Sequence, residues 1–271
     1  MGCRGSAVRI RPPRLETVES IRRSFTLGDM KVQLLATCIV DSLFPEVGEA
    51  TVEVLVKAGA SPTFPAAQTC CGQPLLNAGY PAEARALAAH TLEAFSDEAP
   101  VVVPSGSCAD MIRHRYPELF AKDPRALRQA RALAERTYEL SEFLIDQMMI
   151  ADLAAPDARF FAYHPSCHLL RGLGVDRQPI ELLNAIPGSS VQRLEPDCCG
   201  FGGLFSVDHA PISGEMLTRV IRQIEDSGAE VVVGCDTSCL MQIEGGLRRA
   251  GSSLRCSHLS QALTGRKPGL R

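Results

Sequence analysis

The chain has 271 residues, of which 45% are hydrophobic, and its formal net charge is −3 at neutral pH. This balance offers no basic surface for nucleic acid or anionic lipid, and without tryptophan an aromatic platform for stacked bases is not expected. No apolar stretch is long enough to cross a bilayer, so the composition predicts a globular protein with no membrane span.

The first 29 residues differ from the rest of the chain. They carry six arginines and no hydrophobic periodicity, a pattern found in transit-like and nucleic-acid-binding arms. We favour neither interpretation, because the run VRIRPP resembles the translation of the T-arm of a transfer-RNA gene. Residues 1–29 are therefore expected to be disordered or to lie upstream of the true start, which we predict at Met30.

From residue 31 onwards, short apolar runs alternate with helical patterns. The run at 31–37 and the VVV runs at 101–103 and 231–233 are too short for helices and predict buried strands of a parallel sheet. Residues 46–59 have apolar side chains at helical spacing and end in a glycine, while Asp123 followed by proline predicts the start of another helix. Strands that alternate with helices predict an α/β fold.

Two vicinal cysteine pairs, each followed by glycine, show that the chain repeats itself. There are 31 residues between Cys38 and the Cys70–Cys71 pair, and 30 between Cys167 and the Cys198–Cys199 pair. We therefore predict two tandem, pseudo-symmetric units with mostly parallel sheets flanked by helices. Their expected boundaries are 30–149 and 159–268, joined by a linker at 150–158.

The repeat extends into the segments that follow each pair. VVVPSGSCADM at 101–111 aligns with VVVGCDTSCLMQ at 231–242 if the second segment has one extra residue. In this alignment Cys108 is opposite Cys239, and Ser105 is opposite Cys235. Each half then has the order C…CC…C, with Cys235 as an additional thiol in the second half that we expect to face the same site.

Cysteine usage favours ligands over disulfides. The chain has eleven cysteines, and the sequence shows no secretory signal, so we expect a reducing, cytoplasmic location. Adjacent cysteines are also poor disulfide partners. Cys38, Cys108, Cys167 and Cys235 lie at or just beyond the ends of apolar runs, where open α/β sheets bind ligands.

Three interpretations of these cysteines remain open. Buried free cysteine is common, and it suits Cys3 and Cys256, but it does not account for two matching pairs. Structural zinc usually takes four ligands from short cysteine knuckles, and here only Cys235 and Cys239 resemble one. An iron–sulfur cluster is wider, so neighbouring thiolates can reach different irons. We favour the cluster.

Glycines and histidines next to the cysteines have expected roles at such a site. Gly72 and Gly200 have no Cβ, so backbone amides near them can approach cluster sulfurs and raise the reduction potential. His164 and His168 flank Cys167, and we consider three functions for them: ligation, hydrogen bonding to sulfur, or proton transfer. The alternative is that both are satisfied by local hydrogen bonds.

At this level of detail the chain resembles a known family. The segments LATCIVDSLFPEVGEATVEVLVKAG, TCCGQPLLNAGY, VVVPSGSCADMIRHRYPELF, YHPSCHLLRGLG, CCGFGGLFSV and GCDTSCLMQIEGGL are similar to those of the lactate-utilisation A family. This is a family of iron–sulfur proteins in the cysteine-rich CCG domain superfamily. The same superfamily includes one of the subunits of heterodisulfide reductase and the glycolate oxidase iron–sulfur subunit.

The resemblance implies one or two iron–sulfur clusters per chain, of the 4Fe-4S type, and a metal-ligand set for each half. The first comprises Cys38, Cys70, Cys71 and Cys108, and the second comprises Cys167, Cys198, Cys199 and Cys239, with Cys235 as a candidate fifth. The superfamily pattern ends in C-x-x-C, from which this chain departs in both halves. Ser105 stands where a cysteine is expected in the first half, and Cys235 lies one residue too far from Cys239 in the second.

The resemblance also implies a function. It points to an electron-transfer subunit, and so an oxidoreductase component, of a multi-protein system that oxidises L-lactate to pyruvate and permits lactate utilisation. Its expected partners are two further lactate-utilisation subunits, one with ferredoxin-like clusters, and a small 2-hydroxy acid as substrate of the complex. The alternatives are a cluster-based thiol–disulfide reductase subunit and a zinc-stapled, non-catalytic binding module.

Overall fold

The computed structural model describes residues 30–153 and 158–270. The N-terminal segment at 1–29, with Cys3, lies outside the described residues, as does part of the linker that we predicted at 150–158. Our expectations for those residues remain predictions. Within the described parts of the chain, no helix combines the length and the apolar character needed to cross a membrane.

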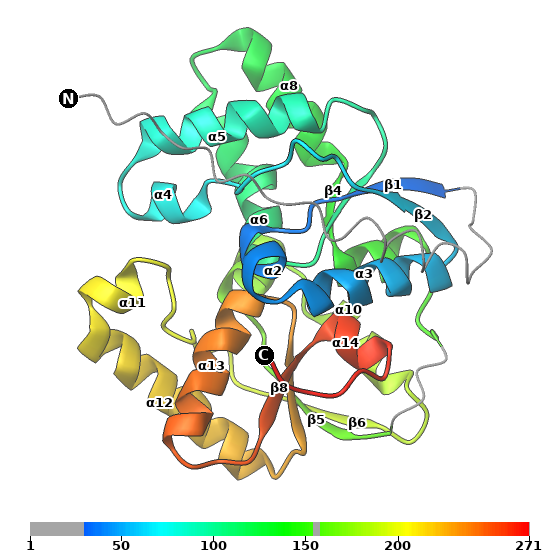
Figure 1. Ribbon diagram of the computed structural model, residues 1–271, viewed down its shortest axis with the longest axis vertical. Helices are drawn as coiled ribbons and strands as arrows, with labels where there is room; N and C mark the ends of the chain where they lie inside the picture. Colours follow the sequence, from blue (N-terminus) through cyan, green and yellow to red (C-terminus); the bar gives the residue numbers. More distant parts are fainter. Residues whose placement is uncertain (1–29, 154–157, 271) are drawn as a thin grey trace.

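Two four-stranded parallel sheets form the framework (Figure 1). Their strand orders are β2-β1-β3-β4 and β6-β5-β7-β8, so the two halves have the same topology. The strands of the first sheet are β1 (Met30–Leu34), β2 (Ala60–Thr63), β3 (Val101–Val103) and β4 (Thr137–Glu139). Those of the second are β5 (Phe160–Tyr163), β6 (Ser190–Arg193), β7 (Val231–Gly234) and β8 (Arg255–His258). The predicted fold class is confirmed.

Helices cover both sheets. Those of the first half are α2 (Cys38–Leu43), α3 (Pro45–Lys57), α4 (Gln73–Asn77), α5 (Pro81–Ala94), α6 (Gly106–Asp110), the π-helical turn η1 (Met111–Arg115), α7 (Tyr116–Leu119), α8 (Pro124–Glu135), α9 (Leu140–Glu142) and η2 (Phe143–Gln147). Those of the second half are η3 (His168–Gly172), α10 (Arg177–Asn184), α11 (Phe205–Asp208), α12 (Ala210–Ser227), α13 (Thr237–Arg249) and α14 (Leu259–Leu263).

Local sequence signals set the ends of these elements. Strand β1 overlaps the apolar run predicted as a strand at 31–37, and α3 covers most of the segment predicted as a helix at 46–59. Gly59 follows α3 with a φ of +83°, a conformation that favours glycine and ends the helix. Asp123 caps α8 by accepting a hydrogen bond from the Ala126 amide at 3.1 Å, as its position before proline predicted.

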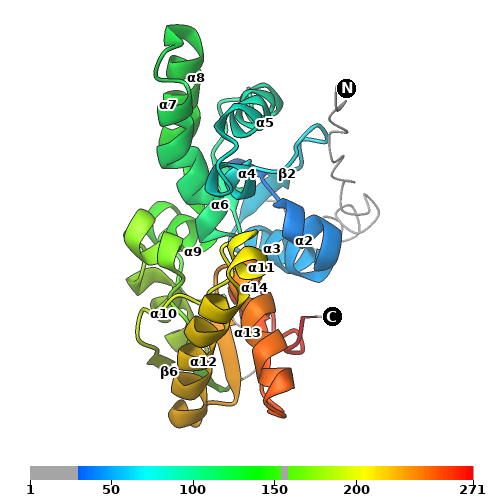
Figure 2. The same ribbon diagram turned by 90° about the vertical axis from the view of Figure 1, so that its left-hand side faces the viewer.

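The two halves meet through reciprocal contacts. Helix α2 of the first half packs on α13 of the second, and the equivalent elements η3 and α6 pack on each other in the same way. Likewise α3 of the first half packs on α14 of the second, and the equivalent helices α10 and α9 form the matching contact (Figures 1 and 2). Each contact thus occurs twice, once with the first element in the N-terminal half and once with it in the C-terminal half, as in an interface with a two-fold axis. The halves are therefore arranged like the subunits of a symmetric dimer, but within one chain.

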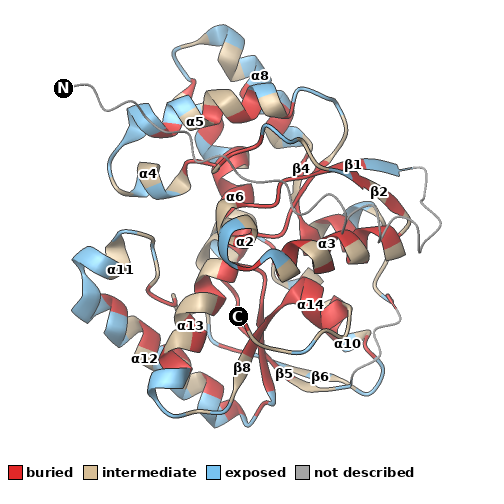
Figure 3. Ribbon diagram, in the orientation of Figure 1, coloured by how far each residue is buried: buried red, intermediate tan, exposed pale blue. Residues whose placement is uncertain are grey.

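A continuous core joins the halves (Figure 3). One hydrophobic cluster includes Leu140 and Phe143 of the first half together with Tyr163 and Leu259 of the second, all at most 1% exposed. At the edge of this contact, Arg266 forms ion pairs with carboxylates on α3. The apolar residues of both halves therefore pack together in this cluster, while the buried residues of another cluster, which includes Met111 and Tyr116, all belong to the first half.

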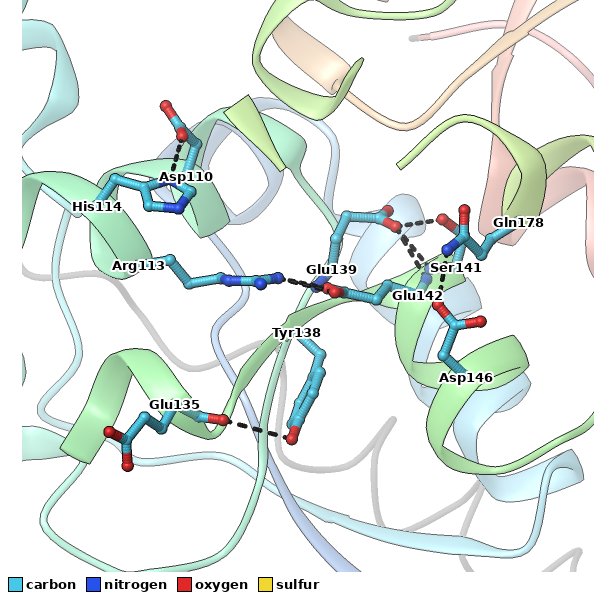
Figure 4. A network of polar contacts seen from close by, with 10 residues as sticks. All are labelled: Asp110, Arg113, His114, Glu135, Tyr138, Glu139, Ser141, Glu142, Asp146 and Gln178. Carbon is cyan, nitrogen blue, oxygen red and sulfur yellow. Dashed lines mark hydrogen bonds and ion pairs between the residues drawn. The ribbon is translucent and has the colours of Figure 1, made fainter. Parts of the chain in front are cut away.

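Two equivalent buried residues cap the short helices that follow the last strand of each sheet. The Glu139 carboxylate accepts a 2.7 Å hydrogen bond from the Ser141 amide at the start of α9 (Figure 4). His258 Nδ1 accepts a 3.2 Å hydrogen bond from the Ser260 amide at the start of α14. Burial raises the pKa of Glu139 to about 7 and lowers the pKa of His258 to about 4.

The His258 cap predicts a loss of stability in acid. Its pKa in the folded protein lies below the ordinary value of 6.5, so the unfolded chain binds the proton more tightly. The free energy of unfolding should therefore fall as the pH drops from about 6.5 to about 4, by at most ~3 kcal/mol from this residue. Urea unfolding of wild type and H258N, followed by circular dichroism across this range, measures the difference.

Asparagine keeps an acceptor at the helix start but does not titrate, so H258N should show the shallower decline. The raised pKa of Glu139 has the opposite effect, since it increases the free energy of unfolding as the pH falls. This contribution is the same in wild type and H258N, so it does not affect the comparison. Parallel pH profiles for the two proteins would contradict the assignment.

Candidate metal centre

The C-terminal ends of the two sheets bring eight cysteines together. Each half contributes one cysteine just after its first strand, a vicinal pair in the loop after its second strand, and one cysteine in the helix after its third strand. In the first half these are Cys38, Cys70, Cys71 and Cys108, and in the second they are Cys167, Cys198, Cys199 and Cys239. The parallel topology thus gathers residues that are far apart in sequence.

Within the first half, the four thiols form a connected group. The Cys38 and Cys70 sulfurs are 3.6 Å apart. The Cys71 and Cys108 sulfurs are 3.4 Å apart. Cys70 and Cys71 also interact, which completes the chain of contacts.

The second half repeats this arrangement. Cys198 lies between Cys167 and Cys199 and interacts with both thiols. Cys199 in turn interacts with Cys239. The order of contacts matches that of the first half at each position, so both halves present four thiols in the same sequence of neighbours.

A single cavity of about 170 Å³ lies between the two groups of thiols. Seven of the eight cysteines line it: Cys38, Cys71, Cys108, Cys167, Cys198, Cys199 and Cys239. Cys70 is not among the lining residues, but its sulfur adjoins that of Cys38. The two sites are therefore neighbours across one cavity.

The first cysteine of each vicinal pair is set up as a thiolate. The pKa of Cys70 is lowered to about 3, chiefly because the Cys38 thiol donates a hydrogen bond to it. The pKa of Cys198 is lowered to about 2, chiefly because of the Cys167 thiol. Cys38 and Cys167, as the donors, have raised pKa values. The thiolate is the form that binds metals.

The two glycines also act at these sulfurs. The Gly72 amide donates to the Cys70 sulfur at 3.5 Å, and the Gly200 amide donates to the Cys198 sulfur at 3.4 Å. Their φ angles are +89° and +82°, which side chains rarely adopt. A Cβ on Gly200 would also lie 2.5 Å from the Ser213 carbonyl oxygen, so the turn needs glycine for conformation and for space.

Neighbouring side chains hold the vicinal pairs in place. Before the first pair, the Gln68 amide group bonds to both the Leu34 carbonyl and the Ala36 amide, which ties the loop to the end of β1. The Tyr116 hydroxyl donates to the Cys71 carbonyl at 2.9 Å. In the second half, the Ser213 hydroxyl donates to the Gly200 carbonyl at 2.8 Å. The sites are thus positioned by the surrounding fold.

The two histidines differ from each other in their contacts. His168 has partners: its Nε2 is 3.1 Å from Gln73 Nε2, and its Nδ1 is 3.5 Å from the Cys167 sulfur. His164 is 1% exposed, and among the described residues neither of its ring nitrogens has a hydrogen-bond partner. Hydrogen bonding thus accounts for His168, chiefly through Gln73 of the other half rather than through a local partner, and it does not account for His164.

The structure corrects the predicted alignment of the two halves. In the first sheet Val102 pairs with Leu34, and in the second sheet Val233 pairs with Tyr163, which is equivalent to Leu34. Val102 is therefore equivalent to Val233, one residue further along the VVV run than a letter-by-letter alignment places it. Ser105 is therefore equivalent to Asp236, and no extra residue is needed. These two residues also form an antiparallel bridge to each other. Cys235, which we aligned with Ser105, instead matches Pro104.

This shift changes the position of Cys235. Its thiol interacts with Tyr163 and Ser141 in the shared core, and it is not among the residues that line the cavity. Successive residues of an extended segment point in opposite directions, and here Asp236 faces the cavity. The expectation that Cys235 faces the same site was wrong. Cys256 is likewise fully buried, in the core of the second half.

Sequence reasoning missed Asp236 and Gln73. Asp236 was not among the predicted site residues, yet it is 3% exposed, lines the cavity and accepts a 2.9 Å hydrogen bond from the Ser107 amide of the other half. The available signal was its spacing, because Asp236 precedes Cys239 by three residues as Ser105 precedes Cys108. Gln73 gave no signal beyond its position after the first CCG.

The donor set fits an iron–sulfur cluster in each half. Four thiols and a glycine amide converge twice, as cluster binding by cysteine requires. Buried polar atoms with no partner among the described residues, Ser166 Oγ and Thr237 Oγ1, belong to residues that line the cavity beside the second group. Such atoms are rare in folded proteins and cost about 1–3 kcal/mol each when unpaired. A bound group at this position would satisfy them.

Comparisons with known proteins agree with this arrangement. The model of the CCG cysteine-rich domain matches the chain twice, at 32–113 and 161–244. Lactate utilization protein A of Geobacillus kaustophilus is 43% identical over 239 residues, which is 88% of this chain and 100% of that protein. The protein of the same name from Macrococcus caseolyticus is 44% identical over 236 residues, 86% of this chain and 96% of that protein.

The chain belongs to the lactate utilization protein A family. A third member, from Bacillus pumilus, is 42% identical over 239 residues, again 88% of this chain and 100% of the relative. The family resemblance predicted from the sequence motifs is confirmed, and the two domain matches contain all eight converging cysteines.

The turn at Gly200 yields a test of how tightly the second vicinal pair is built. G200A should lower the free energy of unfolding by about 2–4 kcal/mol, because it adds both left-handed strain and a clash with a backbone oxygen. The control G228A has a φ of +65° but no atom within 4 Å of the new Cβ, so about 1 kcal/mol is expected. Urea titration compares them, and equal losses would show that the close packing at Gly200 is unimportant.

Proposed function

We propose that this protein is an iron–sulfur electron-transfer subunit of a cytoplasmic, multi-protein system that oxidises L-lactate to pyruvate. The observation that carries the proposal is the pair of four-thiol groups, each with its glycine amide, that meet at one cavity. Lactate comes from the printed names of the relatives. The expected partners are two further subunits of the system, one of them with ferredoxin-like clusters.

The residues of the chain would bind, orient and tune the cofactor. The four cysteines of each half would hold it as thiolates, and the amides of Gly72 and Gly200, which donate to the sulfurs of Cys70 and Cys198, would stabilise the more negative, reduced form. A bound cluster supplies a carrier for single electrons. Lactate gives up two electrons, so the adjacent groups of thiols in one cavity suit a system in which both halves take part.

Zinc is the second candidate for the site. A tetrahedral zinc ion with Zn–S distances of about 2.3 Å places its sulfurs about 3.8 Å apart. The measured sulfur–sulfur distances of 3.6 and 3.4 Å in the first half are close to this value. A protein with zinc in both halves would be a stapled binding module.

Anaerobic purification tests the proposal directly. We expect a brown protein with iron and acid-labile sulfide in similar amounts and with broad visible absorption, as for iron–sulfur clusters in general. A colourless protein that contains zinc and no sulfide would overturn the proposal. The lactate assignment is tested by deleting the gene and measuring growth with L-lactate as the sole carbon source, where normal growth would contradict it.

Two cysteine substitutions in the second half distinguish a metal ligand from a cysteine of the hydrophobic core. C199S should lower the iron content by about half, because the second group loses one of its four thiols. C235A should retain wild-type iron, because Cys235 packs in the core away from the cavity. Iron and sulfide analysis of both proteins, purified without oxygen, gives the comparison.

The same pair should differ in a cell lacking the native gene. C199S is expected to abolish growth on lactate, and C235A to support it. Full iron in C199S would remove the vicinal pair from the site, and loss of iron in C235A with normal folding by circular dichroism would return Cys235 to it.

A further inference from the structure

The two sites are equal in their thiols but not in the residues behind them. The Leu35 amide donates to the Val102 carbonyl at 3.0 Å, and the His164 amide donates to the Val233 carbonyl at 2.8 Å. These are equivalent positions at the ends of β1 and β5. An apolar side chain in the first half is therefore replaced by an imidazole in the second.

The imidazole lies against the second group of thiols. A ring nitrogen of His164 and the sulfurs of Cys199 and Cys239 all lie within 4.8 Å of one another, and all three side chains are buried. Imidazole nitrogen and thiolate sulfur are the donors that zinc and iron centres take. In the first half, Leu35 packs in the hydrophobic cluster around Cys71 and Cys108 and offers no donor.

The ring nitrogens of His164 form no hydrogen bond within the described part of the chain. Both ring nitrogens are buried without a hydrogen-bond partner, although nearly all buried polar groups in folded proteins have one. Packing alone does not require the ring, because Leu35 fills the same position in the first half. A metal bound by Cys199 and Cys239 would lie within reach of a ring nitrogen and could be coordinated by it.

We propose that His164 is a fifth protein ligand to the metal centre of the second half, through a ring nitrogen. The chain then holds two different centres: one with four cysteines in the first half, and one with four cysteines and a histidine in the second. The proposal rests on the function proposed above, in that it assumes a metal centre in the second half. His168, the other histidine near this site, remains hydrogen-bonded to Gln73.

Pulsed electron paramagnetic resonance on the whole protein tests the ligand. The protein is labelled with ¹⁵N-histidine, purified without oxygen and reduced with dithionite. Wild type should show a strong ¹⁵N coupling on one of two cluster signals. H164L should lose this coupling, while H168I, which carries the residue found at the equivalent position Ile39, should keep it. Retention in H164L, or loss in H168I alone, would overturn the proposal.

A second variant, H164C, tests the proposal if H164L does not fold or does not bind iron. H164C keeps a donor at the same place, so it should retain wild-type iron and lose the ¹⁵N coupling; retention of the coupling would overturn the proposal. If the native protein holds only zinc, the iron–sulfur function fails but this inference is still tested. Cobalt(II)-substituted protein, labelled in the same way, should then show the histidine coupling, and its absence would overturn the inference too.

Discussion

The carboxylate of Asp236 joins the two halves at the place where their sheets end. It accepts a 2.9 Å hydrogen bond from the Ser107 amide, and the Ser105 hydroxyl of the other half lies at 3.4 Å from the same oxygen. The remaining carboxylate oxygen accepts from Ser238 at 2.6 Å. A buried carboxylate is tolerated because it is so well hydrogen-bonded. This contact therefore holds the ends of β3 and β7 face to face beside the cavity that the two groups of thiols line.

Sequence reasoning was most successful where a short pattern has one structural solution. The alternation of apolar runs and helical periodicity predicted the α/β class, and Asp123 before proline predicted the start of α8. The spacing of the vicinal pairs predicted two equivalent groups of four thiols. Gly72 and Gly200 were expected to bring backbone amides to cluster sulfurs; their amides donate to the sulfurs of Cys70 and Cys198, and the contact with a cluster stays a prediction.

The failures have two physical origins, strand register and the contact between the halves. Which way a side chain points depends on register, and a shift of one residue in a strand moves it to the other face. Aligning the VVV runs by letter placed Cys235 at the site, whereas the register places Asp236 there. The contact of His168 with Gln73 depends on how the halves meet, which no local pattern contains.

The reciprocal packing of the halves has a consequence for how such a molecule can specialise. In a homodimer built from identical halves, any residue on the two-fold axis meets its own copy, so an aspartate there would face an aspartate. Fusing the two copies into one chain removes this restriction. Serine at 105 can then meet a carboxylate at 236 without charge repulsion. The peptide link between the halves is thus what permits two sites of common ancestry to acquire separate chemical characters.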